Sequence, residues 1–142
     1  MYKRQVLRPI QEKESLELER RIQLYRDGKS LPLLTNKIVI LIDDGLATGA
    51  TAHAALLSIK KHHPKKIIFA SPVCSQEASF AIHPLVDTIV CLQSPEYLEA
   101  IGKYYHDFNQ VTDEEVMTLL NKIKVPRVRH TTMYDFSQKI LW

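Results

Sequence analysis

The stretch ILIDDGLATGAT, Ile40 to Thr51, places two adjacent carboxylates between an apolar run and a turn of small residues. The run that leads into it, KIVILI, is almost continuously aliphatic and β-branched, which is typical of a parallel strand buried on both faces. A helical pattern of roughly Ala50 to His62 follows the turn, and Pro64 ends it. The stretch is therefore predicted to contain a strand, a tight turn and the start of a helix.

The turn has the composition of an anion-binding loop. Gly49 lets the backbone approach a ligand closely, and Thr48 and Thr51 can add hydroxyl donors. The helix that follows offers unpaired N–H groups and the positive end of its dipole. The sequence therefore predicts a phosphate site formed by Ala47, Thr48, Gly49, Ala50 and Thr51.

Asp43 and Asp44 need a different partner, because carboxylates do not bind phosphate. They accept hydrogen bonds from sugar hydroxyls and suit Mg²⁺ as direct or indirect partners. A phosphate site next to paired carboxylates suits a ribose 5-phosphate, whose 2- and 3-hydroxyls would lie on the acids. An ordinary capped strand-to-helix turn would explain Thr48 and Gly49, but it would not explain two adjacent acids.

The remainder of the chain continues an alternation of helices and strands. Leu18, Ile22 and Tyr25 form one apolar stripe on a predicted N-terminal helix, which is stopped by Asp27-Gly28 and so occupies residues 12–27. Further strands are predicted at 66–71 and 86–92 and further helices at 76–82, 95–105 and 112–123, with irregular segments at 1–11 and in a C-terminal tail at 124–142. This order predicts a single α/β domain, residues 1–142, with a right-handed parallel sheet flanked by helices. Three strands make a narrow sheet, so strands on its N-terminal side are expected to be missing.

The complete motif resembles the PRPP-binding signature of the type I phosphoribosyltransferases: an apolar run, two acids, two further residues and then x-T-G-x-T. The segments ELERRIQLYRDGK and 95–116 resemble a subgroup of stand-alone bacterial members. The resemblance implies a Rossmann-like core and transfer of phosphoribose from PRPP to an acceptor, with release of pyrophosphate. It also implies that Asp43 and Asp44 hold the ribose, that residues 47–51 hold the 5-phosphate, and that Mg²⁺ binds near the two acids through the substrate rather than directly to the protein.

The chain departs from the family pattern in three respects. Ala47 stands where purine-salvage members carry a third acid, so 6-oxopurine salvage is not expected. Gly45 replaces the usual Val or Ile, which is expected to loosen the loop. Nothing before Glu12 resembles the half-domain and the Arg-Gly-Gly-rich turn that grip pyrophosphate. The chain therefore resembles the C-terminal half of the fold, and no catalytic residue is assigned.

Three functional interpretations follow from the sequence. The chain is an active phosphoribosyltransferase, or an inactive remnant that binds a ribose phosphate, or an interaction module. The third interpretation arises because an incomplete sheet has an open edge, which predicts a homo-oligomer or pairing with a missing half. The acceptor is not identified, since no segment resembles the variable part of the family that contacts it.

Composition excludes some alternatives. Nineteen basic and sixteen acidic residues give a net charge of +3, which is too small to indicate a nucleic-acid partner. No apolar run reaches the ~20 residues of a membrane span, and the first residues have no apolar core of a signal peptide. Cys74 and Cys91 lack metal-site spacing and are predicted to be buried free thiols. A cytoplasmic location is therefore expected, without a membrane partner.

Several other side chains are interpreted as structural. The histidines His53, His62 and His63 fit ordinary helix positions better than an anion or metal site. An aromatic cluster fits packing better than a base-stacking platform; it comprises Tyr104, Tyr105 and Phe108 beside His106 and Asp107. Glu77 and Lys103 are expected at the surface.

Overall fold

The computed structural model describes residues 2–124, and the side chains of residues 12–122. The described chain forms two compact units. One contains the residues up to Leu31 together with those from Gln110 onward, and the other spans Pro32–Asn109. The motif belongs wholly to the second unit.

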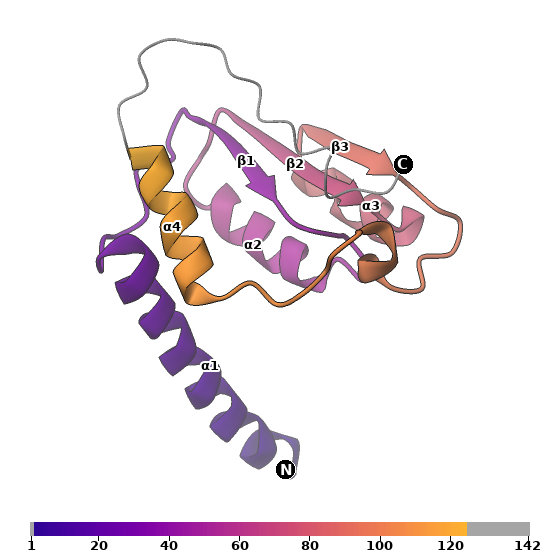
Figure 1. Cartoon of the computed structure of the whole chain (residues 1–142). Coiled ribbons are helices and arrows are strands. Elements are labelled where there is room, and N and C mark those ends of the chain that lie inside the picture. Colours follow the sequence, from indigo (N-terminus) through magenta and orange to yellow (C-terminus); the bar gives the residue numbers. More distant parts are fainter. Residues whose placement is uncertain (1, 125–142) are drawn as a thin grey trace. The chain divides into compact units, whose positions relative to one another are not determined.

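The Pro32–Asn109 unit is built on a three-stranded parallel sheet. Its strands are β1 (Ile38–Ile42), β2 (Lys66–Val73) and β3 (Thr88–Gln93), and their spatial order is β1-β2-β3 (Figure 1). In the register, Ile38 lies opposite Lys66, and Ile68 lies opposite Thr88. The predicted parallel α/β sheet is confirmed.

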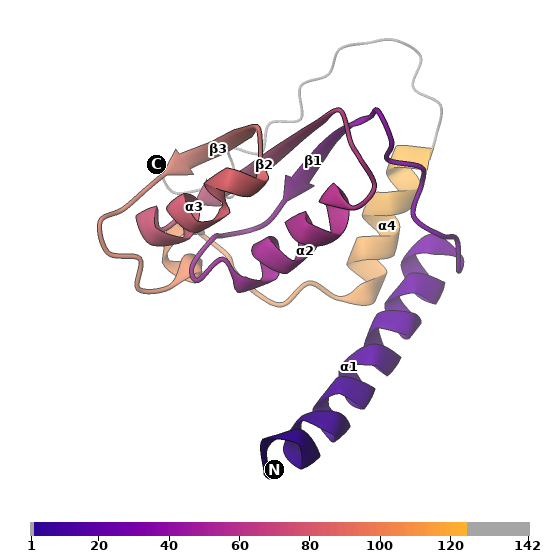
Figure 2. The same cartoon turned by 180° about the vertical axis from the view of Figure 1, so that it is seen from behind.

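Both crossover helices cover the same face of this sheet. Helix α2 (Ala50–Lys60) connects β1 to β2, while α3 (Gln76–Ile82) and the short 3-10 turn η1 (His83–Leu85) connect β2 to β3. Figure 2 shows α2 and α3 in front of the sheet, and Figure 1 shows them behind it. Right-handed crossovers produce this arrangement whenever successive strands add in one direction across a sheet.

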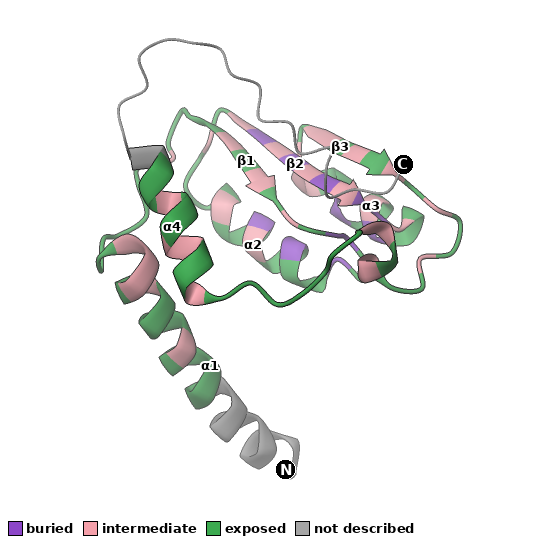
Figure 3. Ribbon diagram, in the orientation of Figure 1, coloured by how far each residue is buried: buried purple, intermediate pink, exposed green. Residues whose placement is uncertain are grey.

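The hydrophobic core lies between the sheet and these two helices (Figure 3). Every second residue of β2, from Ile67 to Val73, is buried, because alternate side chains of a strand point to the same face. The largest fully buried side chain is Phe69, which has 0% exposure. The rest of the buried cluster comprises Leu46, Ala52, Leu56, Cys74, Ala78 and Ile82. Cys74 is a buried free thiol as predicted, whereas Cys91, also free, is only partly buried.

Within the Pro32–Asn109 unit, no helix covers the opposite face of the sheet. On β1, the side chains of Ile38, Ile40 and Ile42 are 60%, 56% and 74% exposed. On β3, Val90 and Leu92 are also exposed. The prediction that β1 is buried on both faces is therefore wrong. An apolar run indicates that a strand can be covered on both faces, but not that the covering layer belongs to the same stretch of chain.

Most predicted elements of this unit are confirmed to within two residues. Helix 76–82 has the predicted bounds, and the strand predicted at 66–71 runs two residues further. The helix predicted at 95–105 is wrong, because only the 3-10 turn η2 (Ile101–Tyr104) forms there. Gly102 disfavours a continuous helix, and contacts of Ile101 and Tyr105 with the turn after β1 compete with helical geometry.

The other unit contains two helices, α1 (Tyr2–Arg26) and α4 (Asp113–Lys124). The prediction that residues 1–11 are irregular is wrong from Tyr2 onward, because α1 begins there and continues through Pro9. The predicted stop at Asp27-Gly28 is confirmed, since both residues have positive φ and the Gly28 N–H donates to the Ile22 carbonyl at 3.2 Å.

Helix α4 begins with the predicted capping box. The carboxylate of Glu115 accepts hydrogen bonds from the backbone N–H and the hydroxyl of Thr112 at 2.8 and 2.9 Å. The Thr112 hydroxyl in turn accepts the Glu115 N–H at 3.3 Å. This reciprocal pairing satisfies two of the backbone donors that every helix start leaves free.

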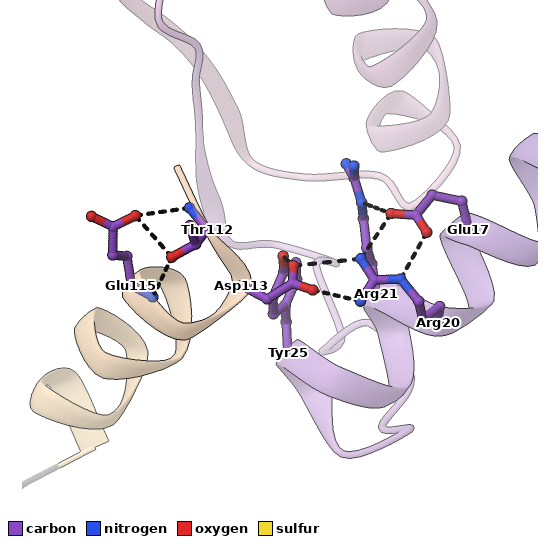
Figure 4. A network of polar contacts seen from close by, with 7 residues as sticks. All are labelled: Glu17, Arg20, Arg21, Tyr25, Thr112, Asp113 and Glu115. Carbon is purple, nitrogen blue, oxygen red and sulfur yellow. Dashed lines mark hydrogen bonds and ion pairs between the residues drawn. The ribbon is translucent and has the colours of Figure 1, made fainter. Parts of the chain in front are cut away.

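One ion pair and one tyrosine hydrogen bond join α1 to α4 in the described residues, and further ion pairs lie within α1 (Figure 4). Asp113 accepts hydrogen bonds from Arg20 at 2.6 Å and from the Tyr25 hydroxyl. Glu17 accepts from Arg20 and Arg21, both at 2.7 Å, and these two guanidinium groups lower the pKa of Glu17 to about 2. Because all these groups are largely solvated, they specify how the two helices meet rather than contribute much stability.

The predicted tail at 124–142 lies outside the described residues except for Lys124, the last residue of α4. Within residues 2–124, no helix combines the length and the apolar content that a transmembrane span requires. The expectations about the tail therefore stay predictions.

Candidate functional site

The turn that follows β1 is held by the end of β2. The Asp43 N–H donates to the Ala70 carbonyl at 3.1 Å, which continues the strand pairing beyond Ile42. The Leu46 N–H then donates to the Val73 carbonyl at 2.8 Å, and its own carbonyl accepts the Ser75 N–H at 2.8 Å. The Leu46 side chain is fully buried. Leu46 therefore fixes the centre of the turn, with the acids on one side of it and the small residues on the other.

The second half of the turn leaves backbone donors available. Gly49 caps α2 with a φ of 75°, in the left-handed region that favours glycine, and no side chain caps this helix end. The amides of Ala47, Thr48 and Gly49 donate to no acceptor in the described part of the chain. The Ala50 N–H reaches the Thr48 hydroxyl only at 3.4 Å. An anion could accept hydrogen bonds from these amides without displacing a protein group.

Both halves of the turn face one pocket of about 260 Å³. This volume lies just below the roughly 300–1,000 Å³ of sites for drug-sized ligands, which suits a small ligand. All seven residues predicted to bind substrate line it, together with Gly45, Leu46, Ala52 and Ile101; the predicted ones are Asp43, Asp44, Ala47, Thr48, Gly49, Ala50 and Thr51. The structure thus brings these residues together, while their binding roles stay predictions.

The two acids differ in environment. Asp43 is partly buried, and its Oδ1 accepts the Asp44 N–H at 3.0 Å, whereas Asp44 is exposed. Burial raises the pKa of Asp43, and the neighbouring charge of Asp44 adds to this effect, although the hydrogen bond from the Asp44 N–H opposes it. Asp43 is therefore a partly desolvated carboxylate, and its oxygens can accept hydrogen bonds from a ligand.

Gly45 does not loosen the loop as the sequence suggested. A Cβ on Gly45 would lie 2.5 Å from both Cγ1 and Cγ2 of Ile101. The Ile101 side chain therefore occupies the space that a branched side chain at position 45 would fill. The side chain that fills this space thus comes from a distant part of the chain.

Tyr105 makes a second contact from the same segment. Its hydroxyl donates to the Asp44 carbonyl at 2.6 Å. Burial raises the pKa of Tyr105, and the charges of Asp44 and Asp43 raise it further. Sequence reasoning did not assign Ile101 or Tyr105 to the site, and the glycine at position 45 was the only signal that another side chain fills this space.

The remaining candidate residues lie outside this pocket. His53 and Glu77 are exposed on α2 and α3 and are not part of its lining. His62 and His63 are exposed, and no group of three potential metal ligands occurs among residues 2–124. Aromatic packing occurs as interpreted between Tyr105 and Phe108, whose ring centroids are 5.0 Å apart, although within a loop rather than between helices.

These observations define an α/β protein with a pocket at the carboxyl end of a parallel sheet, which is where open α/β sheets commonly bind ligands. The chain belongs to the phosphoribosyl transferase family, because the sequence model of the phosphoribosyl transferase domain matches residues 5–108. The resemblance inferred from the motif is thereby confirmed.

Individual relatives agree with this family. The chain is 34% identical over 113 residues to two Mycobacterium tuberculosis proteins, "Putative phosphoribosyl transferase MT0597" and "Putative phosphoribosyl transferase Rv0571c". These matches cover 80% of this chain and 26% of each relative. The crystal structure of TT1426 from Thermus thermophilus is 36% identical, with a TM-score of 0.66, over 72% of this chain and 49% of that one. The chain thus spans about a quarter of the curated relatives and about half of the solved one.

The contact between Gly45 and Ile101 predicts a specific stability pattern. Gly45→Ala should lower the free energy of unfolding by about 1–3 kcal/mol, the usual cost of overpacking. In an Ile101→Ala background the same change should be neutral or stabilising, because the φ of Gly45 is not positive and alanine reduces the entropy of the unfolded chain. Denaturant unfolding of the four proteins measures this coupling; an equal cost in both backgrounds would contradict the contact.

The raised pKa of Asp43 predicts a pH-dependent gain from Asp43→Asn. Above the pKa of the folded protein, the ionised acid lowers the stability of the fold, so the variant should melt at a higher temperature than wild type. The difference should shrink as pH falls and should vanish below the unfolded value of about 3.9. Thermal melts across this range test it; a variant that is less stable at neutral pH would refute it.

Proposed function

We propose that this chain binds a ribose 5-phosphate, PRPP in particular, in the pocket after β1. One observation carries the proposal: Asp43, Asp44 and the unpaired amides of residues 47–49 line the same pocket. Free amides at a helix start suit a phosphate, and carboxylates suit sugar hydroxyls. A pentose phosphate carries both groups a few bonds apart, so one molecule can engage both halves of the turn.

The proposed reaction is transfer of phosphoribose, the chemistry for which the family is named. The acceptor attacks C1 of PRPP, the bond from C1 to pyrophosphate oxygen breaks, and its electron pair leaves with pyrophosphate. Asp43 and Asp44 orient the ribose by accepting its 2- and 3-hydroxyl hydrogens, while the amides fix the 5-phosphate. Ala47 has no ionisable group, so it cannot assist the acceptor by proton transfer.

Mg²⁺ is the proposed cofactor, bound through the substrate. Mg²⁺ is usually held by one or two carboxylates together with substrate phosphates, and Asp43 and Asp44 can provide those carboxylates. When bound, the ion supplies positive charge that stabilises the departing pyrophosphate.

One feature of the pocket favours a second candidate function. Among the described residues, its lining includes no Lys, Arg or His. Pyrophosphate carries several negative charges, and the only charged side chains in the lining are the two acids. This favours a protein that binds ribose phosphates without releasing pyrophosphate, unless another segment or another chain supplies cationic side chains.

Calorimetry with ribose 5-phosphate, and with PRPP and Mg²⁺, tests the binding proposal. The Asp43→Asn/Asp44→Asn variant should bind ribose 5-phosphate at least about tenfold more weakly, the loss expected of one charge-assisted hydrogen bond. Glu77→Gln/Glu96→Gln removes the same charge from two exposed positions outside the pocket and should bind like wild type. No binding by wild type, or equal binding by both variants, would refute the proposal.

A pyrophosphate-release assay then separates the two candidate functions. Release from PRPP in the presence of an acceptor mixture supports the transferase. Binding of PRPP without release supports the ribose-phosphate-binding protein.

We also propose that a second copy of the chain pairs with the open edge of β1. Within the described chain β1 is an edge strand. It contains neither a charged residue nor a proline, which are the residues that usually prevent edge strands from pairing with other chains. Antiparallel pairing of two β1 strands about a two-fold axis would extend both sheets and bring exposed isoleucines together. Pairing with a missing half of the domain stays a prediction. Such a segment would compete with the second copy for the edge of β1.

Light scattering tests the association. Wild type should form a dimer or larger species that dissociates on dilution. Ile40→Lys should shift it to monomer, because the change places a charge on the exposed face of β1 next to the pairing edge. Leu57→Lys changes an exposed residue of α2, on the other side of the sheet, and should leave the association unchanged. A wild-type monomer at the highest soluble concentration would refute a second copy as the partner.

A further inference from the structure

The segment between β3 and the end of the Pro32–Asn109 unit returns to the turn after β1 and touches it twice. The Tyr105 hydroxyl donates to the Asp44 carbonyl at 2.6 Å. The Ile101 side chain lies against the backbone of Gly45 so closely that no Cβ would fit there. Both contacts fall on the two peptide groups that follow the acidic pair.

The anchoring segment is itself compact. The Tyr105 N–H donates to the Gly102 carbonyl at 3.3 Å, at the end of the 3-10 turn. The Tyr105 ring packs on Phe108 with centroids 5.0 Å apart, and Phe108 lies so close to Gly102 that a Cβ there would be 3.0 Å from its ring. A hydroxyl held by such a turn has little rotational freedom, so it can fix the carbonyl it binds.

Asp44 is therefore held on both sides. Its N–H donates to the Asp43 carboxylate at 3.0 Å, and its carbonyl accepts the Tyr105 hydroxyl. These two bonds orient the peptide planes on either side of the Asp44 Cα, and the direction of its side chain follows from that orientation. Asp44 is otherwise exposed, so no packing would hold it in place.

We propose that Tyr105 and Ile101 are positioning residues that aim the carboxylates of Asp43 and Asp44 at the ribose of the ligand. This inference rests on the proposed function. Neither residue acts on the reacting atoms; each acts through the backbone of the acidic pair. The phosphate half of the pocket is held separately by Ser75, whose hydroxyl donates to the Ala47 carbonyl at 2.7 Å.

This separation distinguishes positioning from general support of the fold. If Tyr105 positions only the acids, its loss should weaken ligands that carry ribose hydroxyls and leave inorganic phosphate unaffected. If Tyr105 merely stabilises the whole turn, both ligands should weaken together. The high pKa of the Tyr105 hydroxyl keeps the donor proton in place throughout the neutral range.

The test compares Tyr105→Phe with Tyr97→Phe, a control at a tyrosine that is 81% exposed and outside the pocket lining. Calorimetry measures the affinities for ribose 5-phosphate and for inorganic phosphate. Tyr105→Phe should bind ribose 5-phosphate about fivefold more weakly, as the loss of one neutral hydrogen bond implies, with the affinity for inorganic phosphate unchanged. Tyr97→Phe should match wild type for both ligands.

Two results would overturn the inference: equal affinity of Tyr105→Phe and wild type for ribose 5-phosphate, or an equal loss for both ligands. Amide hydrogen exchange, measured on the protein without ligand, tests the positioning role independently of the binding experiment. Tyr105→Phe should accelerate exchange at Asp44 and Gly45 but not at Leu46, which β2 holds. If wild type binds no ribose 5-phosphate, the proposed function fails, and unchanged exchange would show separately that Tyr105 does not hold the acidic pair.

Discussion

The candidate site depends on the hydrogen bonds that tie Leu46 to the end of β2. The N–H and carbonyl of Leu46 continue the parallel pairing past the last residue of β1, and the Leu46 side chain is fully buried. With this residue fixed, the chain must turn within a few positions on either side of it. The acids before it and the free amides after it are therefore directed at one pocket. A motif that is contiguous in sequence becomes a two-sided site because its middle residue belongs to the core.

The order of the strands explains why α2 and α3 leave one face of the sheet uncovered. Each crossover is followed by a strand on the same side of the last one, so α2 and α3 both fall on one face. Covering the second face requires a reversal of strand order, as in doubly wound sheets, and the described residues contain none.

Local features of the sequence predicted local features of the structure. The turn at Gly49 and the capping box at Thr112 were predictable, because each depends on residues a few positions apart. The exposure of one face of β1 was not predictable, because the sequence of an apolar strand does not indicate which segment covers it. The segment around Ile101 was also mispredicted as a helix, because its conformation depends on contacts with Gly45, which lies more than fifty positions earlier. The missed parts of the site are thus its long-range contacts.

The uncapped start of α2 links the ligand to the folding equilibrium of the protein. Helix α3 obtains its first hydrogen bond from Ser75, whereas α2 begins at a glycine that offers no side-chain oxygen. Any anion bound there would complete the hydrogen bonding of the helix and would favour the folded chain in proportion to its concentration over its dissociation constant. Occupancy of this helix start and stability of the native state would then rise and fall together.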